Sequence, residues 1–238
     1  NQLGYGVTTR FLSTASGQER LSLTAAQLRY FSDRKVFLCD APGGVCTQDP
    51  MTLGFLSPTE SFSPIAANMT YRVDESWSLV GDYAWDPATS ATNNTQVNLH
   101  FQAEGNRIFN AGYGYLVNGD MTQVGTTAWQ DKALNQISAS YAWPFNDSWS
   151  SLGGYSYNIS KQYQMMSFLG IQYDRCCWAL RLLGGRTFRS LNPATALPQY
   201  TNSVFVQILL KGLGSVGTND PTSTLRTYLP TYQDPFKA

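Results

Sequence analysis

The feature that most constrains this chain is a two-residue alternation of apolar and polar side chains that persists along unusually long segments. It is clearest in TQVNLHFQAE, residues 95–104, where Val97, Leu99, Phe101 and Ala103 share one face of an extended chain. The other face carries Gln96, Asn98, His100, Gln102 and Glu104. A tilted strand needs about 9–11 residues to cross a bilayer. The segment therefore predicts a β-strand of membrane-spanning length with one apolar and one polar face.

Similar segments recur along the chain, among them NQISASYAW, CWALRLLGG and SVFVQILLKG. Short polar turns alternate with longer connections between them, as in outer-membrane barrels, which have periplasmic turns at one rim and external loops at the other. The expected long connections are residues 32–62, 87–93, 118–133, 159–161 and 189–199. The eleven strands predicted are residues 2–12, 19–31, 63–73, 77–86, 94–104, 107–117, 134–143, 148–158, 162–173, 177–188 and 200–211.

An internal echo supports this interpretation. VDESWSLVGDYAW (73–85) and FNDSWSSLGGYSY (145–157) each give a turn, then Ser-Trp-Ser, then a strand ending in aromatic residues. Trp77 and Trp149 would follow short turns, where amphipathic rings anchor strands at a membrane interface. The alternative is two ordinary hairpins with buried tryptophans.

Composition helps to choose the fold class. Charged residues make up 13% of the chain and the net charge is zero, which argues against a nucleic-acid partner. No apolar run approaches 18 residues, so no transmembrane helix is expected. A soluble β-sandwich would also alternate, but its strands usually run about five to six residues. We therefore predict an all-β, antiparallel transmembrane β-barrel.

The four cysteines fall into two pairs. Cys39 and Cys46 flank DAPGGV, whose turn formers let the chain fold back and bring the two sulfurs together. We expect a local disulfide in an external loop. A metal pair would lack further Cys or His ligands here, and two free thiols are the remaining alternative.

Cys176 and Cys177 are adjacent and follow the short turn YDR, which places them at the periplasmic rim. Neighbours in an extended segment point to opposite faces, and a disulfide between them needs an unusual backbone. If Cys39 pairs with Cys46, each of these two is free, strained against its neighbour, or bonded to something outside the chain.

Two other functional classes are possible for a chain of this kind. A barrel hydrolase needs a nucleophile and a base, but His100 is the sole histidine and is expected in a polar lumenal wall. We found no catalytic, metal or phosphate-binding motif, so neither an enzyme nor a cofactor is expected. A self-contained porin-like channel is the second alternative. The expected lumenal charges, Arg181, Lys211 and Glu104, do not form the one-sign cluster of a constriction.

The stretches GIQYDRCCWALRLL, QILLKGLGSVGT and TLRTYLPTYQDPF closely resemble the C-terminal part of the LptD family, which assembles lipopolysaccharide in Gram-negative outer membranes. The opening NQLGYGVTTRF and the strand spacing fit the same family, so the resemblance covers essentially the whole chain. It implies that residues 1–211 are the last strands of a larger outer-membrane barrel and that residues 212–238 are a periplasmic or lumenal tail. The chain, which opens without Met, would then be a mature or truncated piece.

The resemblance also implies roles for particular residues. Cys176 and Cys177 would form disulfides to an N-terminal periplasmic domain that lies upstream of Asn1. Residues 200–211 would form one lip of a lateral seam, with Val204, Val206, Ile208 and Leu210 on its apolar face. The partners implied are lipopolysaccharide, an LptE-type plug lipoprotein, an LptA-type periplasmic bridge acting through the missing domain, and membrane lipid.

Overall fold

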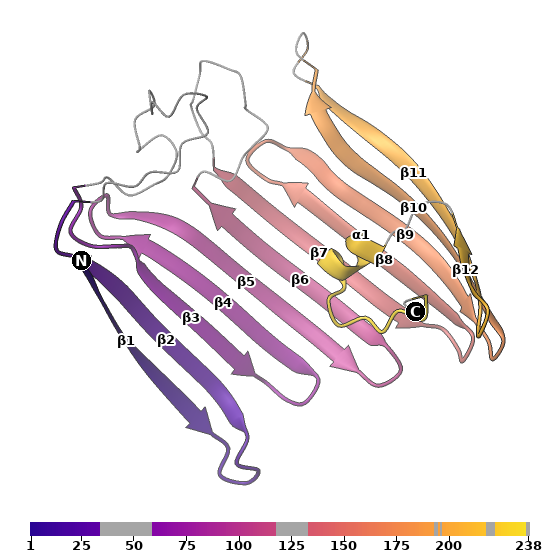
Figure 1. Cartoon of the computed structure of the whole chain (residues 1–238), viewed down its shortest axis with the longest axis horizontal. Coiled ribbons are helices and arrows are strands. Elements are labelled where there is room, and N and C mark those ends of the chain that lie inside the picture. The colour runs from indigo at the N-terminus through magenta and orange to yellow at the C-terminus, as the bar shows by residue number, and fades with distance from the viewer. Residues whose placement is uncertain (34–58, 118–132, 193–194, 196, 218–221, 237–238) are drawn as a thin grey trace. The chain divides into compact units, whose positions relative to one another are not determined.

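The computed structural model describes residues 1–33, 59–117, 133–192, 195, 197–217 and 222–236. Its elements are antiparallel strands followed by one short helix (Figure 1). They are β1 (Gln2–Leu12), β2 (Glu19–Tyr30), β3 (Ile65–Arg72), β4 (Trp77–Asp86), β5 (Ala91–Ala103), β6 (Arg107–Leu116), β7 (Leu134–Pro144), β8 (Trp149–Asn158), β9 (Tyr163–Asp174), β10 (Trp178–Leu191), β11 (Pro198–Leu210), β12 (Gly214–Gly217) and α1 (Thr222–Tyr228).

The strands pair in chain order, from β1 to β12, in one antiparallel sheet. This confirms the all-β prediction, and each of the eleven predicted strands is present with its ends within three residues. Two long connections are shorter than expected, at residues 87–90 and 192–197. The β10–β11 ladder causes the second difference, because it continues past a bulge at Phe188/Ser190 to the pair Leu191–Pro198.

The predicted last strand is not the last strand of the described sheet. β12 lies within the expected tail and pairs with the end of β11, from Gln207 opposite Gly217 to Leu210 opposite Gly214. Two glycines with left-handed backbones allow the reversal, Gly212 with φ 91° and Gly214 with φ 125°. The sequence prediction missed β12 because a four-residue segment with glycine at both ends has almost no alternation to detect.

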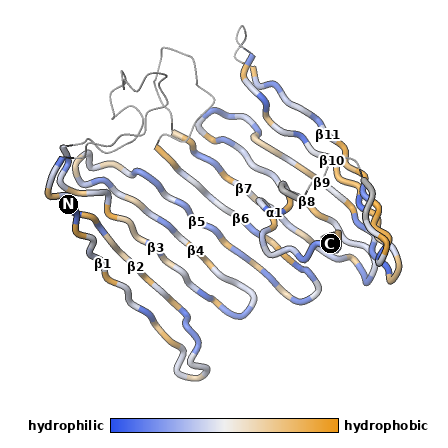
Figure 2. Tube along the Cα trace, viewed as in Figure 1, coloured by the Kyte–Doolittle hydropathy of each residue, from blue (hydrophilic) through white to orange (hydrophobic). Residues whose placement is uncertain are grey.

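The chain divides into two compact units. The first comprises Asn1–Arg72, Leu79–Val97 and Gly114–Asn135. On one face of its sheet, the hydroxyls of Thr8 and Thr24 lie 3.1 Å apart, and the Asn68 amide donates to Asp82 Oδ1 at 2.7 Å. Thr24 stands directly opposite both Thr8 and Asn68 in the ladders. The other face exposes Leu3, Tyr5, Val7, Phe11, Leu23 and Tyr83. Figure 2 shows the resulting alternation of hydropathy along the strands.

The second unit comprises Val73–Ser78, Asn98–Tyr113 and Gln136–Ala238. One face of its sheet exposes apolar side chains such as Ile137, Trp143, Leu169, Ile171, Leu182, Val204 and Ile208. The opposite face is covered in part by α1 and the residues after it, and the buried core lies in this contact. Of the residues that the structure describes, none belongs to a helix that could span a membrane.

A glycine pair in β8 shows how closely both faces of this unit are packed. A Cβ at Gly153 would lie 2.3 Å from Tyr141 Cε1 on one face, and a Cβ at Gly154 would lie 2.3 Å from Phe168 Cε1 on the other. Each glycine therefore leaves room for an aromatic ring from a neighbouring strand. Phe168 then lies in position to contact Tyr228 of α1, with the ring centroids 5.8 Å apart.

Candidate functional site

The C-terminal tail docks on one face of the second unit through an apolar patch. Leu225 and Leu229 are one helical turn apart, joined by a hydrogen bond from the Leu229 amide to the Leu225 carbonyl at 2.7 Å. Both side chains are fully buried. The patch that they cover consists of Ile108, Ala142, Leu152, Phe168 and Leu183, contributed by five successive strands. Full burial of a leucine side chain contributes roughly 1.5–3 kcal/mol, so these two residues supply much of the docking energy.

Arg181 of β10 is the polar centre of the same contact. Its side chain is completely buried, and it forms an ion pair with the nearly buried carboxylate of Asp234 in the tail. The guanidinium also donates to Gln172 Oε1 of β9 at 2.9 and 3.0 Å and to Gln207 Oε1 of β11 at 3.1 Å. Phe236 lies under the guanidinium, with 4.3 Å between the Arg181 Cζ atom and the ring centroid. A buried charge is tolerated only when it is paired and hydrogen-bonded, and Arg181 is both.

Two further contacts hold the tail around this ion pair. The Tyr232 hydroxyl donates to Gln172 Oε1 at 3.0 Å. The Asn106 side chain donates to the Gln233 carbonyl at 2.9 Å and accepts from the Gln233 amide at 3.1 Å. The last described residues of the chain are therefore fixed to the turn before β6 as well as to β9 and β10.

His100 belongs to a polar network beneath α1. Its Nδ1 atom lies 2.9 Å from Asn110 Oδ1, and the Asn110 amide donates to Ser140 Oγ at 3.2 Å and to the Tyr228 carbonyl at 3.3 Å. The Ser140 hydroxyl also donates to that carbonyl, at 2.5 Å. Each side chain in this network has a polar partner, as expected for a structural wall. No cluster of three metal-ligating residues occurs in the described part of the chain.

Burial changes the acidity of two tyrosines in the tail. Loss of solvent raises the pKa of Tyr232 above its ordinary value of 10.0, although the nearby Arg181 charge acts in the opposite direction. Burial likewise raises the pKa of Tyr228. Both hydroxyls therefore stay neutral in the docked tail at physiological pH.

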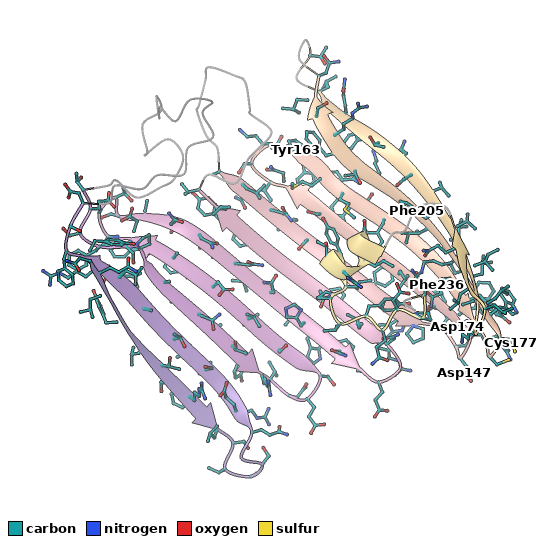
Figure 3. The ribbon with its side chains drawn as sticks, in the orientation of Figure 1. Asp147, Tyr163, Asp174, Cys177, Phe205 and Phe236 are labelled. Carbon is teal, nitrogen blue, oxygen red and sulfur yellow. The ribbon has the colours of Figure 1, made fainter. Side chains whose placement is uncertain are left out.

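The adjacent cysteines lie in the short turn between β9 and β10, at the same end of the strands as Asp147 and Asp174 (Figure 3). Cys176 and Cys177 are exposed free thiols with their sulfurs 2.9 Å apart. A hydrogen bond with Cys176, together with the Cys176 charge, raises the pKa of Cys177. Both thiols are exposed and therefore accessible to another segment of the protein. Cys39 and Cys46 lie outside the described residues.

The cysteine turn is joined to the β11–β12 turn. The Lys211 amide donates to the Cys177 carbonyl at 3.0 Å, and Lys211 Nζ lies 2.5 Å from Asp174 Oδ1. The predicted tether point and the end of the last long strand are thus neighbours in the fold. Sequence spacing gave no sign of this contact.

Trp77 and Trp149 begin β4 and β8, directly after turns of the same kind. The Asp74 carboxylate accepts from the Trp77 amide at 2.8 Å, and the Asn146 side chain accepts from the Trp149 amide at 2.9 Å. The sequence echo therefore corresponds to one repeated turn. Their role as interface anchors stays a prediction.

Both tryptophans belong to an aromatic row on the exposed apolar face. Trp77 packs on Phe101 with ring centroids 4.7 Å apart. Trp149 packs on Tyr173 at 4.9 Å, and Tyr173 packs on Trp178 at 4.8 Å. Such rows at strand ends are typical of membrane β-proteins, whose aromatic girdles lie at the level of the lipid headgroups.

The four residues assigned to the seam, Val204, Val206, Ile208 and Leu210, lie on the exposed face of β11. β12 pairs with the end of β11 and forms the edge of the described sheet beside that end. The seam prediction itself is not tested by these contacts.

The sequence prediction missed the partners that Arg181 finds in the tail. Two signals were present: the four-residue spacing of Leu225 and Leu229, which suits one face of a helix, and Asp234, the one acidic residue in the sequence of segment 222–238.

Comparison with known proteins gives the family. Residues 1–149 match the family model for LptD, LPS transport system D. The LPS-assembly protein LptD of Legionella pneumophila (strain Lens) is 54% identical over 237 residues, which cover 100% of this chain and 28% of that protein. The LPS-assembly protein LptD of Pseudomonas aeruginosa (strain LESB58) is 34% identical, covering 92% of this chain and 25% of that protein. The chain thus spans about a quarter of the length of these relatives.

Two solved structures also align with most of the chain at low identity. The ferripyoverdine receptor of the Pseudomonas aeruginosa outer membrane is 11% identical, with a TM-score of 0.42, over 91% of this chain and 34% of that one. A mutant porin of Rh. blastica is 10% identical, with a TM-score of 0.39, over 92% of this chain and 85% of that one. The sequence matches and the alternating antiparallel strands lead to the same result: the chain belongs to the LptD family and is part of an integral outer-membrane β-barrel.

Proposed function

We propose that this chain is the C-terminal part of a barrel that moves lipopolysaccharide to the cell surface and inserts it into the outer leaflet of the outer membrane. Membership of the LptD family supports this, since the relatives are LPS-assembly proteins. LptD is a transport and assembly protein rather than an enzyme, so no covalent chemistry is assigned to the chain.

The observation that carries the proposal is the difference between the two faces of the strands. In the first unit, Asp82 and Asn68 form a polar contact on one face, while Tyr83, the next residue along β4, is exposed on the other. Lipopolysaccharide poses a matching problem, because its sugars prefer a hydrated wall and its acyl chains prefer lipid. The polar face would guide the sugars.

The acyl chains would leave through a lateral seam formed by the last strands of this chain and the first strand of the full-length barrel. Separating two strands exposes unpaired backbone groups, which is costly in lipid and therefore only transient. β12 is only four residues long, so it can offer few backbone pairs to the first strand of the full-length barrel. Val204, Val206, Ile208 and Leu210 would face the lipid beside this opening.

The remaining assignments concern partners. Disulfides from Cys176 and Cys177 to an upstream periplasmic domain would hold that domain, and an LptA-type bridge attached to it, at the rim where the cysteines are exposed. An LptE-type plug lipoprotein would occupy the lumen of the complete barrel. The test of the disulfides is non-reducing peptide mass spectrometry on the full-length protein. Free thiols in the mature protein would contradict the tether.

The transport proposal is tested by photo-cross-linking in cells that depend on the full-length protein. A photo-reactive phenylalanine analogue at Asp82 is expected to capture lipopolysaccharide, and the same analogue at Tyr83 to capture mainly membrane lipid. The two positions are adjacent on β4 and point to opposite faces. Equal capture at both positions, or none at Asp82 while delivery continues, would contradict transport along the polar face.

The seam is tested separately. A cross-link that joins β12 to the first strand of the full-length barrel should stop delivery of lipopolysaccharide, and reduction of the cross-link should restore it. Delivery that continues unchanged with the seam closed would rule out this exit route.

A further inference from the structure

The docked tail is connected to the last strand by a very short segment. Only residues 218–221 separate Gly217 of β12 from Thr222 of α1. Four intervening residues give five steps between α-carbons, which span at most about 18 Å. When α1 and the residues after it are docked, the end of β12 cannot move far from the sheet of the second unit.

β12 is weakly held by its own pairing. It is four residues long, begins and ends with glycine, and its described ladder is with β11 alone. Ordering a backbone residue costs roughly 1–2 kcal/mol, and glycine loses more freedom than other residues. A few ladder hydrogen bonds, each worth about 0.5–1.5 kcal/mol net, offset little of that cost.

One end of β12 is fixed by the turn that precedes it. The Leu213 amide donates to the Leu210 carbonyl at 2.9 Å, and Lys211 bonds the cysteine turn. The other end, at Gly217, lies away from this turn, so the strand would peel from that end first. The anchoring of the chain beyond Gly217 therefore decides whether β12 stays paired.

The contacts of the tail are strong enough to hold that end. The Arg181–Asp234 ion pair is buried, Phe236 stacks on the guanidinium, Leu225 and Leu229 fill the apolar patch, and Gln233 is bonded through both of its backbone groups. These contacts are distributed over β6 to β11, so the docking of the tail does not depend on any single strand.

We propose that the docked tail is a latch that keeps β12 paired with β11, and that release of Asp234 from Arg181 lets β12 peel away from Gly217 towards Gly214. If the proposed function holds, the latch sets how readily the lateral seam opens. The pairing of β12 can be measured without any lipopolysaccharide, so the latch and the transport function can fail independently.

The test is hydrogen exchange, resolved to single residues, on the full-length protein in lipid nanodiscs. Asp234→Ala removes the ion pair and frees the tail to leave, which exposes Arg181 to water. The β12 amides that bond to β11 are expected to exchange faster by on the order of tenfold or more, most at the Gly217 end and less towards Gly214, since exchange reports the open population. The matched control is Glu19→Gln, which removes an ion pair with Arg10 on the exposed β1–β2 hairpin and should leave β12 unchanged.

A second, milder variant keeps the test informative if Asp234→Ala prevents the protein from folding. Tyr232→Phe removes one hydrogen bond to Gln172 and keeps the ring. It should raise exchange of the paired β12 amides by less than Asp234→Ala does, again most at the Gly217 end. If tail amides at residues 225–233 exchange faster in both variants while β12 stays protected, the tail only lines the wall and the latch is wrong. If neither the tail nor β12 responds, the buried ion pair does not hold the tail, and the latch is equally wrong.

A lipopolysaccharide-delivery assay on the same variants separates the two proposals. Loss of delivery with β12 still protected contradicts the latch and leaves the transport proposal standing. Faster exchange at β12 in a protein that captures no lipopolysaccharide at Asp82 supports the latch and contradicts the proposed function.

Discussion

At the scale of single residues, buried polar side chains on the covered face of the sheet depend on the C-terminal tail for their hydrogen-bond and ion-pair partners. Arg181 is the clearest case, because its carboxylate partner lies 53 positions further along the chain. The sequence predicted the face on which Arg181 lies, since Trp178, Leu180 and Leu182 alternate with it. It did not predict the burial, because alternation reports which face a residue occupies and not what covers that face.

Tyr232 gives a pH-dependent prediction. Its pKa is raised in the docked tail chiefly by burial, so docking favours the neutral phenol. The stabilisation is complete below pH of about 10 and is lost as the pH rises through the higher pKa of the docked state, since the undocked tail ionises first. Trypsin cleavage after the exposed Arg226 should therefore accelerate above pH of about 10 in the full-length protein. Tyr232→Phe should show a shallower rise than the parent protein, and an identical rise in both would contradict this assignment.

Cys177 gives a prediction about reactivity. Its pKa is raised first by the hydrogen bond with Cys176 and then by the Cys176 charge, whereas the Lys211 charge lowers it. In reduced full-length protein at pH 8, Cys176→Ala should speed iodoacetamide modification of Cys177 roughly two- to tenfold, because more thiolate is present. Lys211→Met should act in the opposite direction and slow the reaction. The rate of Cys177 modification is followed by mass spectrometry in each variant. A change in the same direction in both variants would refute this assignment.

At the scale of elements, the strands were predictable and the tail was not. Segments such as residues 95–104 repeat one pattern over a full membrane thickness, which predicts both strand and face from local information alone. β12 and α1 lack that signal. β12 is short and rich in glycine, and α1 is a seven-residue helix that is stabilised by the patch on β6 to β10 rather than by its own sequence.

The glycine pair of β8 gives a prediction for packing between elements. Gly154→Ala places a methyl group 2.3 Å from Phe168 Cε1, so the ring that contacts Tyr228 must move. We expect a loss of about 1–3 kcal/mol in the free energy of unfolding, measured by urea titration of the full-length protein in detergent. Faster proteolysis of the tail should accompany it, because Phe168 supports α1.

Gly114→Ala is the matched control, since it is also a strand glycine and a Cβ there meets nothing within 4 Å. Both substitutions restrict the unfolded chain equally, so the difference between them isolates the steric term. Equal unfolding free energies for the two variants would mean that Phe168 moves aside at no cost.

At the scale of the whole molecule, the strand order leaves two ends. β1 and β12 are the first and last strands of the described sheet, and β1 is exposed along its entire length. The chain covers 28% of the length of the Legionella relative, which fits one portion of a larger closed wall. In hydrocarbon each unpaired backbone group costs several kcal/mol, so two open edges are incompatible with stable insertion.

We therefore expect residues 1–238, expressed alone with an export signal, not to insert stably in the outer membrane. The measurement is the heat-dependent shift in gel mobility that marks a folded barrel, together with protease protection in isolated membranes. The full-length protein provides the positive control. A variant that lacks the tail after Gly217 should behave like the complete segment, because the missing edge partners, rather than the latch, limit folding. A compact, protease-resistant monomer from the segment alone would show that its strands satisfy their own edges, and would favour a self-contained channel over a seam completed by strands from elsewhere in the protein.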